Sequence, residues 1–227
     1  MALNKTLVEL GRRLSYVFRR PELLEQALTH RSKGAENYER LEFLGDSILG
    51  FTISSELYNR YPALSEGELT RLRASLVNKN TLAALARDIG IGSYLRLGEG
   101  ELKSGGYDRD SILADSLEAV FGAICKDSTV DEVMRVILHL YRERLASLDP
   151  RSVPKDPKTQ LQEHLQKQAL PTPTYVVREI TGEAHNQNFV VECQVTGLET
   201  RVQGRGSSRR HAEQEAAARV LDLLFHR

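Results

Sequence analysis

The chain has 227 residues, with 41% hydrophobic and 27% charged residues and no tryptophan, which is ordinary for a soluble globular protein of two modest domains. No apolar run approaches the roughly 20 residues that span a bilayer, which excludes a helical membrane protein. The first 154 residues carry 21 of the 31 basic and 22 of the 31 acidic residues, so neither part of the chain is a basic domain. Any affinity for phosphate must therefore come from local placement of cations.

The N-terminus and the cysteines indicate the compartment. Met1-Ala-Leu-Asn-Lys5 leads into Leu7–Leu10 without an apolar signal core. Cys125 and Cys193 are too few for a disulfide framework or a zinc site, so both are expected to be reduced core thiols. These features favour a cytoplasmic protein.

The first two thirds of the chain favour helices. Apolar positions recur there with helical period and β-branched alternating runs are scarce, which predicts an all-α domain over residues 4–147. Pro21 is expected to open a helix over residues 22–28, and Gly90 and Gly92 are expected to close one.

The segment Glu39-Arg-Leu-Glu-Phe-Leu-Gly-Asp-Ser47 is the most informative part of the chain. It places Glu39, Glu42 and Asp46 at i, i+3 and i+7, which stacks three carboxylates along one helical face. Carboxylates about 5 Å apart repel by roughly 3 kcal/mol per pair at an effective dielectric near 20. A hard cation such as Mg²⁺ would turn that repulsion into binding. The same pattern also fits an amphipathic surface helix with a solvated acidic face.

A second acidic pair weighs against that simpler interpretation. Asp115 and Glu118 lie at i and i+3 on a helix for which Ser111, or Asp110 just before it, is the expected N-cap. Small residues beside them, Gly122 among them, would let another helix or a polyanion approach closely.

Both acidic helices also carry an apolar stripe on another face. These stripes are Leu41, Leu44, Ile48 and Phe51 in the first helix, and Leu113, Leu117, Val120, Phe121 and Ile124 in the second. If the two helices pack through these stripes, four carboxylates converge at the rim of the contact.

A Pro-rich polar stretch over residues 148–157 predicts a linker, and the pattern changes after it. A helix is expected over 159–168, strands over 175–180, 189–195 and 198–203, and a last helix over 207–225. In the second strand, alternation predicts one buried face and one solvated face, the solvated one with Val190, Glu192 and Gln194. In the last helix, one side is expected to carry Ala212, Ala216, Val220 and Leu223. Residues 158–226 are therefore expected to form a small α-β-β-β-α domain, with both helices on one face of an antiparallel sheet.

Cations gather where the last helix is expected to begin. Arg205, Arg209 and Arg210 crowd a helix N-terminus, where backbone N–H groups already favour anions. This arrangement predicts a phosphate clamp, although a solvated charged cap is the alternative.

The two acidic segments resemble the signature helices of the ribonuclease III family. The resemblance extends to Leu28-Thr-His-Arg-Ser32, Ser65-Glu-Gly-Glu-Leu-Thr-Arg71 and Leu76-Val-Asn-Lys-Asn-Thr-Leu82 and covers nearly the whole first two thirds of the chain. The last 70 or so residues (158–226) resemble a double-stranded-RNA-binding domain through Gly206-Ser-Ser-Arg-Arg-His-Ala-Glu-Gln-Glu-Ala-Ala217. One departure is His211, where a third cation is expected.

The resemblance implies roles for individual residues. Glu42, Asp115 and Glu118 would hold Mg²⁺, while Asp46 and Glu118 would position the attacking water or a second ion. Glu39 would contact RNA near the scissile bond or orient neighbouring residues. His30 is interpreted as structural or supporting, and no nucleophilic role is implied for Ser47, because it has no suitable histidine partner.

The resemblance also implies how RNA is bound. Such domains read A-form geometry across two minor grooves and the phosphates between them. Gln160 and Glu163 would contact one groove and His185 the next, while Arg209 and Arg210 would bind phosphate. For Gln160 and Glu163, ordinary helix surface is the alternative.

Phe43 lies on neither stripe of its helix. In the family that the chain resembles, this aromatic residue enters a socket on a second subunit, so a homodimer is expected, with Glu66 near its interface. Phe43 packed within its own monomer is the alternative.

The implied activity is Mg²⁺-dependent endonucleolytic cleavage of double-stranded RNA, which leaves 5′-phosphate and 3′-hydroxyl ends with short 3′ overhangs. Ribosomal RNA precursor processing and mRNA turnover are the implied duties. Two other hypotheses stay open: a non-catalytic duplex-RNA-binding protein, and an acidic helical protein-interaction module with an RNA-binding tail. Neither an organic cofactor nor a membrane partner is expected.

Overall fold

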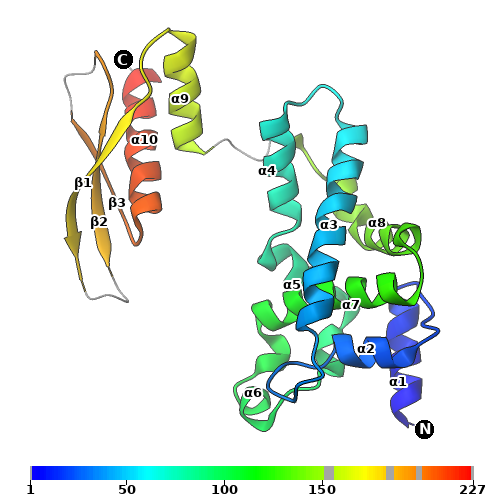
Figure 1. Ribbon diagram of the computed structural model, residues 1–227. Coiled ribbons are helices and arrows are strands. Elements are labelled where there is room, and N and C mark those ends of the chain that lie inside the picture. The colour runs from blue at the N-terminus through cyan, green and yellow to red at the C-terminus, as the bar shows by residue number, and fades with distance from the viewer. Residues whose placement is uncertain (1, 151–155, 183–186, 198–200, 226–227) are drawn as a thin grey trace. The chain divides into compact units, whose positions relative to one another are not determined.

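The structure is a computed structural model that describes residues 2–150, 156–182, 187–197 and 201–225. The chain divides into two compact units, Met1–Val153 and Pro154–Arg227 (Figure 1). Among the described residues, no helix combines the length and the apolar character needed to cross a bilayer.

The first unit is built from helices, as the periodicity predicts. They are α1 (Ala2–Arg13), α2 (Pro21–Ala27), α3 (Glu39–Arg60), α4 (Glu66–Leu76), α5 (Lys79–Ile89), α6 (Glu99–Lys103), α7 (Asp110–Asp127) and α8 (Val130–Ala146), with 3-10 turns η1 (Ile91–Tyr94) and η2 (Gly106–Asp108). Helix α7 lies at the centre, in contact with α2, α3, α5 and α8 (Figure 1). Most of its side chains are buried, because its sequence is apolar nearly all the way round.

Two glycines allow α3 and α7 to cross with their backbones in contact. A Cβ atom on Gly45 would lie 1.7 Å from the carbonyl oxygen of Glu118, and one on Gly122 would lie 2.1 Å from the carbonyl oxygen of Leu41. Only glycine fits such an approach, because any side chain would overlap the facing main chain. The small residues predicted near the acidic side of α7 therefore serve the approach of another helix.

Local sequence signals set several helix ends. Pro21 occupies the first turn of α2, and Gly90 ends α5 in a left-handed conformation with φ of 81°. Gly92, however, lies inside η1 and closes no α-helix. The expected N-cap of α7 is also wrong, since Arg109 takes that position and Asp110 is the first helical residue.

The apolar face predicted for α3 is only partly correct. Leu41 and Ile48 are buried, but Leu44 is half-buried and Phe51 is 60% exposed. The face that packs on the core instead follows the rows of residues four apart, which pass through Gly45. Its buried members are Leu41, Gly45, Ile48, Leu49, Thr52, Ile53 and Leu57.

The second unit has the predicted α-β-β-β-α order. It consists of α9 (Pro157–Lys167), β1 (Thr174–Thr181), β2 (Asn188–Gln194), β3 (Val202–Gly206) and α10 (Arg209–Phe225). The strands form an antiparallel sheet in the order β1-β2-β3, and both helices cover one face of it (Figure 1). Leu161 and Leu165 of α9 share a core with Cys193 of β2 and with Ala216 and Val220 of α10.

Several predicted boundaries and faces in this unit change. Pro157, placed in the linker, is the first residue of α9. The third strand begins at Val202, and residues 198–200 lie outside the described residues. Leu223 is 38% exposed and does not join the core face of α10. Glu192, expected on the solvated face of β2, is only 3% exposed, because Arg178 covers it with two hydrogen bonds of 3.0 and 2.8 Å.

The glycine crossing yields a stability prediction. We expect Gly45→Ala to lower the free energy of unfolding of the first unit by about 1–3 kcal/mol or more, the usual cost of overpacking against a rigid neighbour. Gly67→Ala in α4 is a matched control, because its new Cβ would meet only the Arg71 side chain at an ordinary 3.6 Å. Urea unfolding followed by circular dichroism measures both, and equal midpoints for the two variants would contradict the tight crossing.

Candidate active site

The α3–α7 crossing brings acids from two distant segments together. Glu42 on α3 and Asp115 and Glu118 on α7 each offer a carboxylate oxygen, and these three oxygens all lie within 4.8 Å of one another. All three residues are half-buried. The two helices therefore place the predicted ligands on one small patch at the rim of their contact.

Asp46 and Glu39 lie at the edge of this patch. Glu39, Glu42, Asp46 and Glu118 line one hollow together with Phe43. Asp46 is exposed, and its charge is felt at both Glu42 and Glu118. Glu39 is half-exposed and faces Arg31 at 3.6 Å. All four core acids named from the sequence thus converge, with Asp46 on the solvent side.

A second cleft, of about 440 Å³, is lined by Glu42 and Asp115 together with His30 and Tyr38. The Tyr38 hydroxyl lies 3.5 Å from Asp115 Oδ2, and the buried His30 ring packs edge-on against the Tyr38 ring. His30 Nδ1 also contacts Ser32 Oγ at 2.7 Å. His30 is therefore placed to support Tyr38, while Tyr38 itself was missed from the sequence because it lies just before the acidic helix.

The cleft is charged with both signs. Arg31 and Arg109 line it along with the acids, and Arg109 pairs with Glu101 at 2.7 Å. A surface of this kind accepts a polyanion beside a carboxylate cluster, because the arginines offset part of the repulsion.

The crowding of the acids shifts their proton affinities. Burial, with the charges of Asp46, Glu42 and Asp115, raises the pKa of Glu118 to about 8. Burial, followed by the charge of Asp115, raises the pKa of Glu42 to about 7. The pKa of Asp115 is raised by burial too, although the Tyr38 hydrogen bond opposes the shift. Near neutral pH, protons thus partly neutralise the cluster when no cation is bound.

A separate face of α3 is apolar and exposed. Phe43, Phe51 and Tyr58 are 78%, 60% and 72% exposed, and they repeat along one side of the helix. At the far end of this face, Tyr58 and Glu66 border a hollow whose other walls include Leu57, Leu64 and Leu69. Phe43 therefore does not pack inside its own monomer.

The predicted RNA contacts of the second unit are distributed over two helices. Gln160 and Glu163 are half-buried on α9, and Arg209 and Arg210 are exposed in the first turn of α10. Arg205 is exposed on β3. His185 lies outside the described residues.

Comparison with known proteins assigns both units. A family model described as "Ribonuclease-III-like" matches residues 20–145, and one described as "Double-stranded RNA binding motif" matches residues 157–224. The protein is therefore of the class in which a ribonuclease-III-like domain is followed by a double-stranded-RNA-binding motif.

Full-length relatives agree with this class. The chain is 53% identical to proteins named "Ribonuclease 3" from Vibrio vulnificus, over 98% of this chain and 99% of the relative, and from Proteus mirabilis, with the same coverage. Two solved structures of the nuclease domain of the Campylobacter jejuni ribonuclease III match with TM-scores of 0.59 and 36% identity, over 61–62% of this chain and 97% of each domain. The chain belongs to the ribonuclease III family.

The raised pKa values predict how stability depends on pH in the absence of metal. Folded Glu42 and Glu118 keep protons that the unfolded chain releases near pH 4.5, so their contribution to stability is present at low pH and is lost as pH rises through about 7 and 8. Glu118→Gln removes one of these charges. We expect this variant to gain about 1–2 kcal/mol over the parent at pH 8.5, after allowance for solvent screening, and nothing at pH 4.5.

Urea unfolding in EDTA across this pH range measures the difference between the two chains. A difference independent of pH would show that the acids do not titrate as a cluster.

Proposed function

We propose that Glu42, Asp115 and Glu118 hold a magnesium ion with which this ribonuclease cleaves double-stranded RNA to 5′-phosphate and 3′-hydroxyl ends. Endonucleolytic cleavage of double-stranded RNA is the activity of the family to which the chain belongs. The observation that supports the ion is the approach of three carboxylate oxygens, from two helices, to within 4.8 Å of one another.

The acids suit the ion that we propose. Magnesium prefers carboxylate oxygens at about 2.1 Å, so two oxygens that share it lie about 3–4 Å apart. The oxygens of Glu42, Asp115 and Glu118 would move by less than about 1 Å to reach that spacing. Magnesium retains several waters when bound, and the open hollow beside Asp46 leaves room for them.

Each side chain then has a distinct task in hydrolysis. A bound magnesium ion supplies neutralisation of the phosphoryl charge and activation of water. Asp46 and Glu118 flank the hollow and would orient the attacking water by accepting its hydrogen bonds. Tyr38 would hold Asp115 in place through its hydroxyl. Glu39, with Arg31, would contact RNA next to the scissile bond.

The second unit would bind the duplex through Gln160 and Glu163 in one minor groove, His185 in the next, and Arg209 and Arg210 on the phosphates between them. Precursors of ribosomal RNA and structured mRNA are the proposed substrates. Such substrates agree with the cytoplasmic location expected from the sequence, which stays a prediction.

The metal proposal predicts a separation of cleavage from binding. Glu118→Ala should abolish Mg²⁺-dependent cleavage of a plain RNA duplex, because the ion loses a ligand and water loses an acceptor, yet leave metal-free duplex binding nearly unchanged. Gel analysis with and without Mg²⁺ measures both. Glu143→Ala, which removes an exposed acid on α8, is the control and should keep full activity.

Survival of cleavage in Glu118→Ala would contradict the site assignment. A parent chain that binds duplex and never cleaves it would favour the non-catalytic alternative. A parent that does neither would favour the protein-interaction module.

We also propose that the chain acts as a homodimer through the exposed face of α3. A twofold axis across this face would run two α3 helices antiparallel and bring Phe43 of each copy to the hollow beside Tyr58 and Glu66 of the other. One of the two Campylobacter jejuni structures is described as showing flexibility in a region of the nuclease domain involved in dimer formation, which supports a dimer of this chain but does not identify the interface. Two acidic sites would then face one duplex, one for each strand.

The dimer proposal is tested with Phe43→Arg. The hollow already holds one acid and one base, Glu66 and Arg73, so an arginine would add an unbalanced charge and lose the apolar burial of the phenyl ring. The variant should therefore sediment as a monomer at concentrations where the parent is a dimer. Leu102→Arg is the matched control, since Leu102 is an exposed apolar residue (53%) on α6 and should leave the dimer intact. A dimeric Phe43→Arg variant would rule out this interface.

A further inference from the structure

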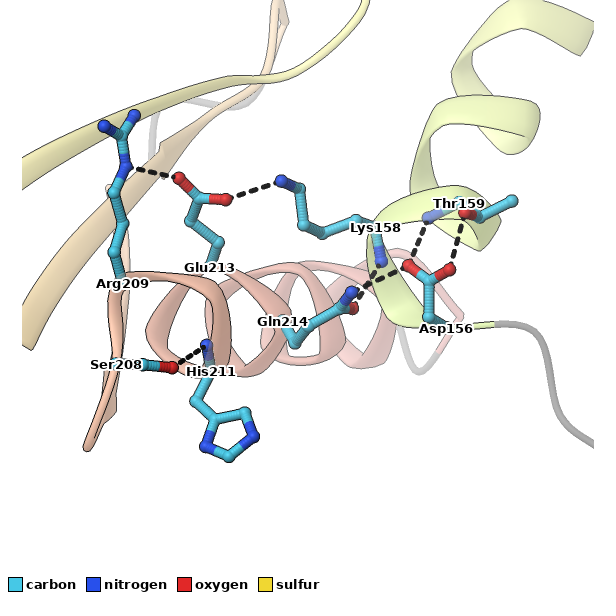
Figure 2. Close-up of polar contacts among 8 residues, drawn as sticks. All are labelled: Asp156, Lys158, Thr159, Ser208, Arg209, His211, Glu213 and Gln214. Carbon is cyan, nitrogen blue, oxygen red and sulfur yellow. Dashed lines mark hydrogen bonds and ion pairs between the residues drawn. The ribbon is translucent and has the colours of Figure 1, made fainter. Parts of the chain in front are cut away.

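A network of polar side chains joins the N-terminus of α9 to the second turn of α10. We call it the α9–α10 clasp and define it as Asp156, Lys158, Glu213 and Gln214; Figure 2 shows it together with Arg209. The contacts between the two helices join residues 55–58 positions apart in sequence, so no local sequence pattern indicates them.

Half of the clasp completes the N-terminus of α9. Asp156 accepts hydrogen bonds from the Thr159 backbone at 3.0 Å and the Thr159 hydroxyl at 2.7 Å. Gln214 donates to Asp156 Oδ1 at 2.9 Å and accepts the Lys158 backbone N–H at 3.1 Å. Since Pro157 has no N–H, the exposed donors that begin a helix are satisfied here partly by a side chain from α10.

The other half is a shared carboxylate. Glu213 is only 9% exposed and accepts from Lys158 Nζ at 2.6 Å and from Arg209 Nε at 2.9 Å. Burial alone would raise the pKa of Glu213, but the hydrogen bonds from Lys158 and Arg209 outweigh it and hold the pKa below its usual range. The carboxylate is therefore charged at neutral pH and binds one cation from each helix.

The contact leaves the far end of Arg209 available. Only Nε of its guanidinium faces Glu213, and Figure 2 shows the two terminal nitrogens turned away from the carboxylate. The Arg209 side chain remains 64% exposed. Lys158, in contrast, is turned inward, with Nζ 4.7 Å over the Tyr175 ring as well as on Glu213.

We propose that Glu213 is a positioning residue for RNA binding, which holds Arg209 through Nε so that its two terminal nitrogens meet a phosphate oxygen pair. This inference rests on the proposed function of Arg209 as a phosphate contact. A guanidinium held by one edge keeps the other edge free for bidentate contact, and the ordering of a long side chain is completed before RNA arrives.

Lys158 keeps the net charge around Arg209 positive. A carboxylate paired with Arg209 alone would cancel its charge and repel the phosphate. With Lys158 on the other oxygen, the three side chains carry a net charge of +1, so Arg209 is held and the surface stays attractive. Lys158 is thus the counter-cation of Glu213, and it is half-buried, with its ammonium over the Tyr175 ring.

The alternative is that Glu213 inhibits RNA binding, because its carboxylate competes with phosphate for Arg209. In that case its removal would add one net positive charge and strengthen binding, as counterion release predicts. The two roles therefore differ in the sign of one measurement.

The experiment measures affinity of the full-length chain for a plain RNA duplex in EDTA, where no cleavage occurs, at several salt concentrations. Glu213→Gln should weaken binding by about two- to tenfold, the cost of ordering a long side chain on binding, despite its added positive charge. With Mg²⁺ present, KM should rise and kcat should stay, because the acids on α3 and α7 are untouched. Unchanged or tighter binding by Glu213→Gln would overturn the proposal.

Glu192→Gln is the matched control. Glu192 is a second buried acid of the same unit, paired with Arg178, and it lies on the opposite face of β2 from the core residue Cys193. Its loss should lower the melting temperature comparably and leave RNA affinity within about twofold. If Glu192→Gln weakens binding as much as Glu213→Gln, the effect is general destabilisation and the proposal fails.

Two further variants keep the test decisive. Glu213→Met fills the buried volume with an apolar side chain of similar size, so it serves if Glu213→Gln melts below the assay temperature, and the same weakening is expected. Arg209→Ala tests the premise: it should weaken binding and reduce the salt slope by about one. An inert Arg209→Ala would refute the phosphate contact itself, whereas an effective Arg209→Ala with tighter binding by both Glu213 variants would refute only the positioning role.

Discussion

The contact of α3 with α7 at Gly45 and Gly122 is the constraint on which the nuclease unit depends. The facing carbonyl oxygens lie where side chains would otherwise be. Because the backbones touch, carboxylates on the two helices come within reach of one ion. The cost is electrostatic, since burial and mutual repulsion raise the pKa values of Glu42 and Glu118. Burial of the apolar face of α7 against its neighbouring helices supplies the stabilising free energy that offsets this repulsion.

The acidic cluster could be predicted from the sequence because its information is local. Spacings of three, four and seven residues decide which side chains share a helical face. Two acidic faces can therefore be predicted, one in Glu39–Ser47 and one in residues 110–123. The orientation of α3 could not be read in the same way. Phe51 is as apolar as any core residue, but it faces outward, while Gly45 contributes no hydrophobicity and lies at the centre of the packing.

Ion pairs between residues distant in sequence also could not be predicted from the sequence. Asp110 was expected as a cap, but its carboxylate pairs with Arg87 at 2.6 Å, which also binds Asp108. Glu192 was expected in solvent, but Arg178 from the neighbouring strand covers it. Glu213 was not singled out at all, because its partner Lys158 lies on another helix. In each case the partner is distant in sequence, so periodicity carries no signal for it.

A site built on main-chain contact has a further consequence for how its protein can change. The apolar side chains around α7 can be replaced by others of similar volume without moving the acids. The distance between α3 and α7 is set by the contact of Gly45 and Gly122 with the facing backbone, and not by the size of the surrounding leucines. The interior is thereby free to diverge while the spacing of the carboxylates is kept. The two glycines have no such freedom, because no neighbouring substitution can make room inside a facing backbone.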